Sequence, residues 1–357
     1  MRLAAFSSLA LLVGLTTPAL AFDDIFKAIG LMPGAIEEPK AFDYLAPSLG
    51  FANADPNTFG IIDDLDLAAA LMDSKLDDAT GIDFGRATGV FSMGSAPENT
   101  TVIFGETGFA DGAHDALLAR DFTDSEDGEI TIYARGEDNA MDLSAASEPD
   151  PLGSGMGRAQ RLAVASDFVM RTGNWPLINQ SLLVMHTAPG YTKVWADTLR
   201  NMQQVSEDGA QLELASGWTL FAFADALPRF EPGTVPAPGD KTKNPDAGID
   251  PLLAFPLAII GLTRGQETAA LHIAMPYGSP ELAEQAGDII VERLAEFRME
   301  VPEPKVTIIP AGEAGDLPTL IVTMENYESD IGELQDLYFG FIASIYQRDF
   351  KPLMAGL

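Results

Sequence analysis

The chain has 357 residues, of which 21 are lysine or arginine and 53 aspartate or glutamate, and its net charge is −32. Hydrophobic residues make up 46% of it, an ordinary globular share that excludes a wholly disordered protein. A surface this acidic repels DNA, RNA and anionic lipid headgroups, so nucleic-acid binding is excluded. The acidity fits two interpretations: capture of cations or of a basic partner, or adaptation to salty surroundings.

The sequence contains no cysteine. Thiolate catalysis, cysteine–zinc sites, iron–sulfur clusters, disulfide bonds and a lipid anchor on cysteine are therefore excluded. No cofactor is expected from any other pattern in the chain.

Residues 1–21 have the pattern of a secretory signal peptide. Arg2 is followed by an apolar run from Leu3 to Leu15, and the segment ends in Ala19-Leu20-Ala21. A positive start, a short apolar stretch and an A-x-A site predict export and cleavage after Ala21. The expected location is the periplasm of a Gram-negative bacterium, with release to the medium as the alternative.

Proline-rich segments predict the domain organisation. Residues 22–227 are interpreted as an N-terminal α+β domain, residues 228–250 as a proline-rich linker or long loop, and residues 251–357 as a C-terminal α+β domain. Loops this long are uncommon inside one compact domain. The competing interpretation is one continuous sheet, in which a strand over residues 218–224 pairs with residues 257–262.

The predicted elements of the first half alternate between strands and helices. The turn dipeptide Asp127-Gly128 predicts a hairpin, and Ser166-Asp167 separates a second strand pair. Expected strands span residues 101–104, 130–133 and 161–170, and expected helices span residues 113–120, 175–185 and 193–205.

In the second half, residues 257–263 and 269–275 predict an antiparallel hairpin around a turn at residues 264–267. Ser279 and Pro280 predict the start of a helix that extends to residue 298. Residues 305–309 and 320–324 predict a strand pair, and residues 330–349 a helix with an apolar face directed toward the core.

Strand runs interrupted by single helices favour an α+β fold with antiparallel sheets and packed helices, arranged as two sandwich-like subdomains. No membrane span is expected in the mature chain. The best candidate, Leu252 to Thr263, is short and contains Pro256, so it predicts a buried strand instead.

Motifs for nucleophilic or nucleotide chemistry are absent from the sequence. No G-x-S-x-G nucleophile elbow occurs, and the serine in residues 153–157 lies in a glycine-rich loop. Residues 239–242 resemble the end of a P-loop, but Asp240 separates the glycine from the lysine. The three histidines, His114, His186 and His272, are isolated and lack zinc-ligand spacing.

Carboxylate chemistry is harder to exclude, because a glycosidase needs only two acids at the right separation. Trp175, Trp195 and Trp218 are expected in the core or at its boundary rather than as sugar platforms. Residues 124–129 resemble half of a calcium loop, but the EF-hand spacing fails and a hairpin turn explains them better. The acid clusters at residues 63–66 and 77–78 are expected to be solvated surface.

The sequence thus predicts an exported, soluble, acidic protein that acts as a non-enzymatic periplasmic binding or accessory module with another envelope component. The expected partner is an envelope protein or a small molecule. The alternatives are a hydrolase with a carboxylate pair and a divalent-cation-binding protein. No catalytic or metal-binding residue is assigned by the sequence.

Overall fold

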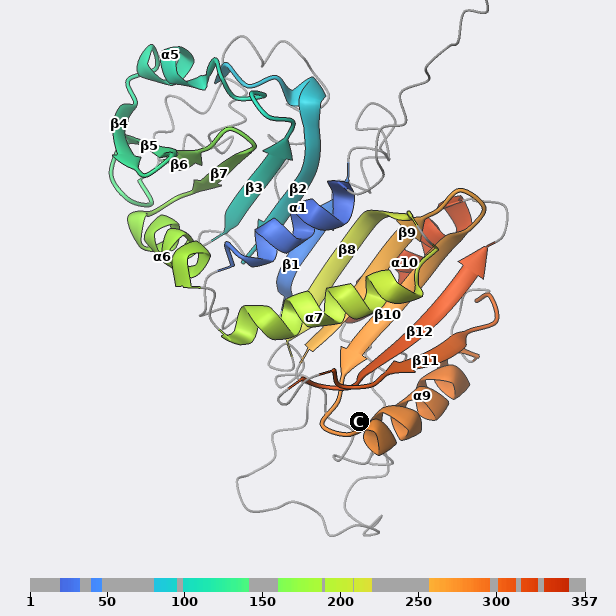
Figure 1. Cartoon of the computed structure of the whole chain (residues 1–357). Helices are drawn as coiled ribbons and strands as arrows, with labels where there is room; N and C mark the ends of the chain where they lie inside the picture. Colours follow the sequence, from blue (N-terminus) through green and yellow to red (C-terminus); the bar gives the residue numbers. More distant parts are fainter. Residues whose placement is uncertain are drawn as a thin grey trace, which may run out of the picture.

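The computed structural model describes residues 20–32, 40–46, 80–94, 99–140, 160–187, 190–207, 209–219, 257–295, 301–312, 316–326 and 331–346. Within these ranges the fold is α+β, with one 12-stranded antiparallel sheet and six packed helices. The predicted fold class is therefore confirmed. Both proposed halves contribute strands to this one sheet, which curves across the molecule (Figure 1).

The strand order is β11-β12-β10-β9-β8-β1-β2-β3-β7-β6-β5-β4. The strands are β1 Lys40–Leu45, β2 Ala87–Met93, β3 Thr100–Gly105, β4 Thr123–Asp127, β5 Ile130–Arg135, β6 Gln160–Val164, β7 Phe168–Thr172, β8 Gln211–Thr219, β9 Leu257–Arg264, β10 Ala269–Pro276, β11 Lys305–Ile309 and β12 Thr319–Asn326. The helices are α1 Leu20–Ile29, α5 Ala113–Leu118, α6 Trp175–Thr187, α7 Gly190–Val205, α9 Pro280–Leu294 and α10 Ile331–Tyr346, and a short 3-10 helix, η2, spans Phe84–Arg86.

The pairing of β8 with β9 bears on the two interpretations of the proline-rich segment. Trp218 of β8 pairs with Ala258 of β9, and Thr219 pairs with Leu257. The sheet is therefore continuous from the first half of the chain to the second, as the competing interpretation expected. The strand itself differs from the predicted one: β8 begins at Gln211 rather than at residue 218, and residues 259–262 of β9 pair with residues 214–217. Residues 228–250 lie outside the described residues, and the domain boundaries drawn there stay a prediction.

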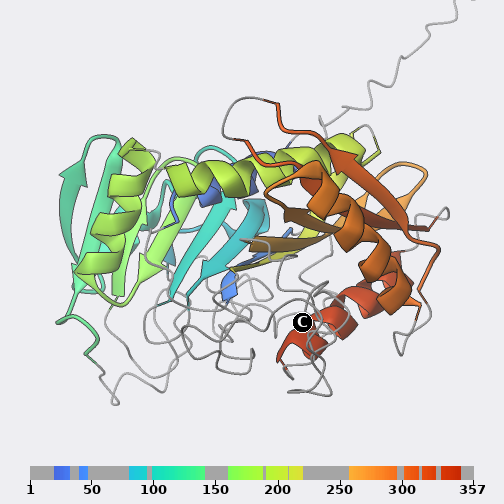
Figure 2. The ribbon, with the colours of Figure 1, turned by 90° about the horizontal axis from the view of Figure 1, so that it is seen from below.

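Helices cover both faces of the sheet (Figure 2). One face packs against α1, α6 and α7, through side chains such as Ile25, Ile178 and Met202. The other packs against α5, α9 and α10, through Leu117, Ile290 and Phe341. Burial of apolar side chains on both faces of a sheet supplies the main driving force for this layered arrangement.

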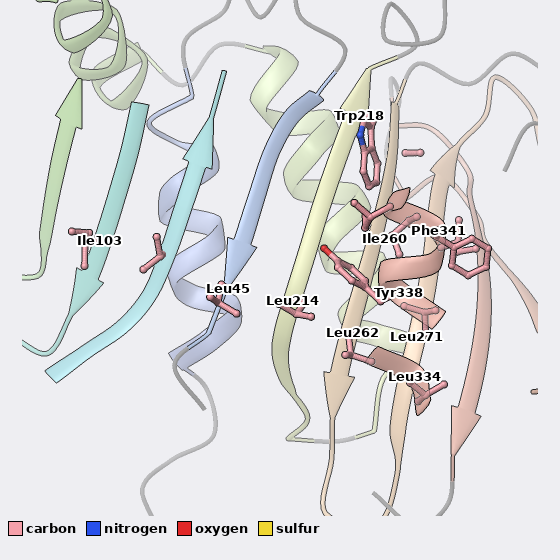
Figure 3. Close-up of a cluster of buried hydrophobic side chains, with 14 of the residues drawn as sticks. Leu45, Ile103, Leu214, Trp218, Ile260, Leu262, Leu271, Leu334, Tyr338 and Phe341 are labelled. Atoms are coloured by element: carbon pink, nitrogen blue, oxygen red, sulfur yellow. The ribbon is translucent and has the colours of Figure 1, made fainter. Parts of the chain in front are cut away.

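Helix α10 shows how the C-terminal apolar pattern is used. Leu334, Tyr338 and Phe341 lie against Ile260 and neighbouring side chains of β9 and β10 (Figure 3). The prediction that this apolar face is directed toward the core is confirmed, because Leu334, Tyr338 and Phe341 are each buried.

Local signals act at the expected helix start and hairpin turn. The Ser279 hydroxyl accepts a hydrogen bond from the Leu282 backbone N–H at 3.3 Å, and Pro280 occupies the first turn of α9. Helix α9 ends at Leu294, earlier than the predicted residue 298. In the β9–β10 turn, the Glu207 carboxylate accepts hydrogen bonds from the backbone N–H groups of Gln266 and Thr268, each at 3.0 Å.

Candidate functional site

The hairpin β4–β5 ends the sheet on one side (Figure 1). Asp127 pairs with Ile130, so Gly128 and Glu129 form a two-residue turn, and Gly128 has φ +66°. A positive φ at this position is typical of hairpin turns and readily adopted by glycine. The interpretation of residues 124–129 as a hairpin turn rather than a calcium loop is thus confirmed.

Strand β4 is exposed along its whole length, since the side chains of all five residues from Thr123 to Asp127 face solvent. Its partner in the sheet is β5. By contrast, the opposite edge strand β11 has only two exposed residues, Lys305 and Val306. Within the part of the chain that the structure describes, the backbone N–H and C=O groups on the outer side of β4 have no strand partner, as is usual for an edge strand.

The exposed hairpin is strongly acidic. In the described part of the chain, Asp124, Glu126, Asp127 and Glu129 make no ion pair. The guanidinium groups at the start of the hairpin, those of Arg120 and Arg135, stack on the ring of Phe122, at 5.9 and 4.7 Å from its centroid. The four carboxylates are thus not neutralised by an ion pair with a described residue.

His272 is fully buried on β10 and is enclosed by hydroxyl groups. Its Nε2 lies 2.9 Å from the Thr263 Oγ1 and 3.3 Å from the Ser206 Oγ, and its Nδ1 lies 3.1 Å from the Thr323 Oγ1. Burial lowers the pKa of His272 to about 4. The Ser206–His272 contact resembles a nucleophile and its base, but a desolvated imidazole oriented by a hydroxyl rather than a carboxylate is a weak base.

The other two histidines are exposed on separate helices. His114 of α5 contacts the Tyr133 hydroxyl, with 3.1 Å between its Nδ1 and that oxygen, and His186 lies near the end of α6. The structure therefore does not bring the three histidines together. No group of three or more histidine or acidic residues that could hold a metal ion occurs among the residues described.

Three carboxylates are buried among the residues that the structure describes, and the sequence did not identify them. Asp24 of α1 is 4% exposed, Asp43 of β1 is 1% exposed and Glu213 of β8 is 0% exposed. The Asp43 carboxylate accepts a hydrogen bond from the Ser216 hydroxyl at 2.5 Å, and Glu213 pairs with Arg264 at 3.2 Å. Burial, the largest cause, raises the pKa of Asp24 to about 6. None of the three carboxylates is open to a substrate from solvent.

A small pocket lies between α7 and the start of β12. Its volume is about 80 Å³, and its lining includes Lys193, Asp197 and Asp316. The Lys193 ammonium lies 2.5 Å from a carboxylate oxygen of each aspartate, and these hydrogen bonds raise its pKa. Ligand pockets are usually several times larger, and the polar groups here already satisfy one another.

The three tryptophans lie in the core or at its boundary. Trp195 and Trp218 are buried in the two cores, as predicted. Trp175, which is partly buried, lies under the guanidinium of Arg161, 5.3 Å from the ring centroid. Arg161 is itself buried; it donates hydrogen bonds to the carbonyl oxygens of residues 135 and 136 and pairs with Asp138 at 2.8 Å. This cluster ties the ends of β5 and β6 to α6.

Large apolar side chains do not gather on the described surface. The exposed ones, Leu118, Leu183 and Val306, lie on three different elements: α5, α6 and β11. An apolar docking patch built from these three side chains is therefore not supported, whereas β4 presents a continuous polar edge.

Several sequence-predicted sites lie outside the described residues: the glycine-rich loop at 153–157, the P-loop-like residues 239–242, and the acid clusters at 63–66 and 77–78. The sequence analysis does not predict the complete exposure of β4, because residues 124–129 match only part of a metal loop and a hairpin turn. The signal available for an edge strand was the acidic residues, Asp124 and Glu126, at alternate positions before the Asp127-Gly128 turn. In the described helices, no segment is both long and apolar enough to cross a membrane.

No protein family and no curated protein matches the chain significantly. Two crystal structures of TP0453 resemble it. Crystal form I has 13% identity and a TM-score of 0.33, over 87% of this chain and 96% of that one. Crystal form IV has 12% identity and a TM-score of 0.35, over 87% and 98%. Identities and TM-scores this low carry no argument about function.

Proposed function

We propose that this protein is an exported, non-enzymatic accessory module that binds a protein of the cell envelope through the exposed edge strand β4. The observation that carries the proposal is the exposure of all five residues of β4, at one end of the sheet. An open strand edge is a template for pairing with another chain.

The buried ionisable groups support a binding role over a catalytic one. Asp43, Glu213 and His272 are each engaged in contacts inside the protein. Enzymes instead direct such groups into an accessible cleft, where a substrate meets them. Export rests on the signal-peptide pattern of residues 1–21.

Site-specific photo-crosslinking in the native envelope fraction tests the proposal. A photoreactive residue at Ser125, in the middle of β4, is compared with one at Gln285, which is exposed on α9. We expect a discrete covalent adduct from position 125 that survives denaturing washes, and none of that size from position 285. Identical adducts from both positions, or no adduct from position 125, would refute binding through β4.

A further inference from the structure

The charge and the open edge of β4 together indicate what kind of chain it binds. We propose that β4 pairs with an extended segment of the partner protein that carries lysine or arginine at alternate positions. This inference rests on the proposed function and names the chemistry of the partner.

Geometry gives the first argument. Side chains alternate between the two faces of a strand, so Asp124 and Glu126 lie on one face of β4 while Ser125 and Asp127 lie on the other. Asp124 is paired with Tyr133, whose side chain belongs to the core on the α5 side of the sheet. A segment added outside β4 thus meets carboxylates on both faces.

Charge complementarity gives the second argument. Opposite charges placed directly across two strands stabilise their pairing, and like charges oppose it. Asp124, Glu126 and Asp127 make no ion pair in the described part of the chain. An acidic strand or β4 of a second copy is therefore repelled, whereas a basic strand gains a cross-strand pair at each carboxylate it faces. The protein's net charge of −32 also accelerates encounter with a basic segment.

Competing occupants are less well supported by the same residues. An apolar partner would find no apolar side chain on β4, which consists of Thr123 to Asp127. A metal ion would need several carboxylates that converge on one point, but the alternation of the strand separates them between two faces. No three-residue metal-ligand group occurs among the described residues.

The test uses the purified full chain and three synthetic nonapeptides. The first alternates lysine with threonine, the second is the same peptide with N-methylated amides at every other residue, and the third replaces lysine with glutamate. N-methylation keeps the charge but removes the backbone donors needed for strand pairing. Fluorescence anisotropy gives each affinity at low and at moderate salt, and amide hydrogen exchange locates the binding.

Two charge-matched variants complete the design. The edge variant carries Asp124→Asn, Glu126→Gln and Asp127→Asn. The control variant carries Glu284→Gln, Asp288→Asn and Glu292→Gln on the exposed face of α9. Both variants remove three exposed carboxylates, so they change the net charge equally. Thermal unfolding of both checks that the fold is kept.

We expect the lysine peptide to bind the wild type and the control variant, and to protect the amides of residues 123–127 from exchange. The edge variant should bind it about twofold to thirtyfold more weakly, because the alternate lysines all lie on one face of the added strand and the two cross-strand charge pairs with Asp124 and Glu126 are lost. The methylated and acidic peptides should bind far more weakly than the lysine peptide.

Equal weakening in the two variants, or equal binding of the methylated peptide, would overturn the inference, because either result shows unspecific attraction to a polyanion. Absence of lysine-peptide binding at low salt would also overturn it. A crosslink at position 125 together with failure of the peptides refutes only the basic-strand partner. Failure of the crosslink refutes the proposed function itself.

Discussion

The buried carboxylate of Asp24 makes stability depend on pH in a way that can be predicted. Asp24 lies on α1, which packs against β2 and β8, and its side chain is 4% exposed. Its Oδ2 is buried without a hydrogen-bond partner. Desolvation raises the pKa of Asp24 from 3.8 to about 6, although a hydrogen bond with Thr88 and the charge of Lys27 act in the opposite direction.

The magnitude follows from linkage between protonation and folding. The native pKa of Asp24 is raised, so the native state binds more protons than the unfolded state between about pH 4 and pH 6. Above about pH 6 the ionised carboxylate therefore lowers the free energy of unfolding by its full amount. This destabilisation disappears as the pH falls toward 4. At 1.36 kcal/mol for each pKa unit, the penalty is about 3 kcal/mol at pH 7.5 and about 1.5 kcal/mol at pH 5.

Asp24→Asn removes the charge and nearly preserves the shape. We expect the stability of the variant relative to wild type to increase by about 1.5 kcal/mol when the pH is raised from 5 to 7.5. This difference is independent of any constant cost of placing an amide in the site. Urea unfolding at both pH values measures it, at pH values that stay above the sequence pI of about 4.1.

The adjacent residue supplies a matched control. Asp23 lies on the same helix but is exposed, so Asp23→Asn should change stability by less than about 0.5 kcal/mol at both pH values. A stability difference between Asp24→Asn and wild type that is the same at pH 5 and pH 7.5 would refute the reasoning, because it would show no charge penalty at the buried site.

Two further predictions concern buried polar clusters. His272→Ala should cost about 2–4 kcal/mol of unfolding free energy, since it opens a cavity and removes the partner of the Thr263 and Thr323 hydroxyls. In wild type, an NMR signal that is lost in His272→Ala and titrates near pH 6.5 would contradict the burial that lowers the pKa of His272 to about 4. Arg161→Lys should cost about 2–3 kcal/mol in urea unfolding, because lysine lacks the planar group that reaches two carbonyl oxygens and Asp138 together. Asp138→Asn, on the more exposed partner, should cost less, and equal losses would contradict this ranking.

Much of the secondary structure was predictable because its signals are local. The Asp127-Gly128 turn, the Ser279 cap and the three- and four-residue spacing of apolar side chains in α10 each act within a few residues. By contrast, α1, β1 and β2 were missed. They are short, and β2 is buried at nearly every position, so no polar–apolar alternation marks it as a strand.

Only part of the candidate site could be predicted from the sequence. The acidic residues 124–129 were identified, and their hairpin was predicted correctly. The acidic residues of β4 were a signal that its side chains are exposed, but its place at the end of the sheet could not be derived, because strand order depends on which strands pair far along the chain, such as β3 with β7. The burial of Asp24 and Glu213 was not predicted either, because acidic side chains are normally exposed. Only tertiary packing decides which of the 53 acidic residues are buried.

The sequence by itself determined the acidic surface, the absence of cysteine chemistry and most of the strands and helices after residue 100, because composition and short-range spacing fix these properties. Only the tertiary structure decided that β8 and β9 join both halves of the chain in one sheet and that β4 forms an open edge of it. Strand order depends on long-range pairing, in which many antiparallel partners satisfy the same hydrogen bonds and the choice is made by packing of the two faces.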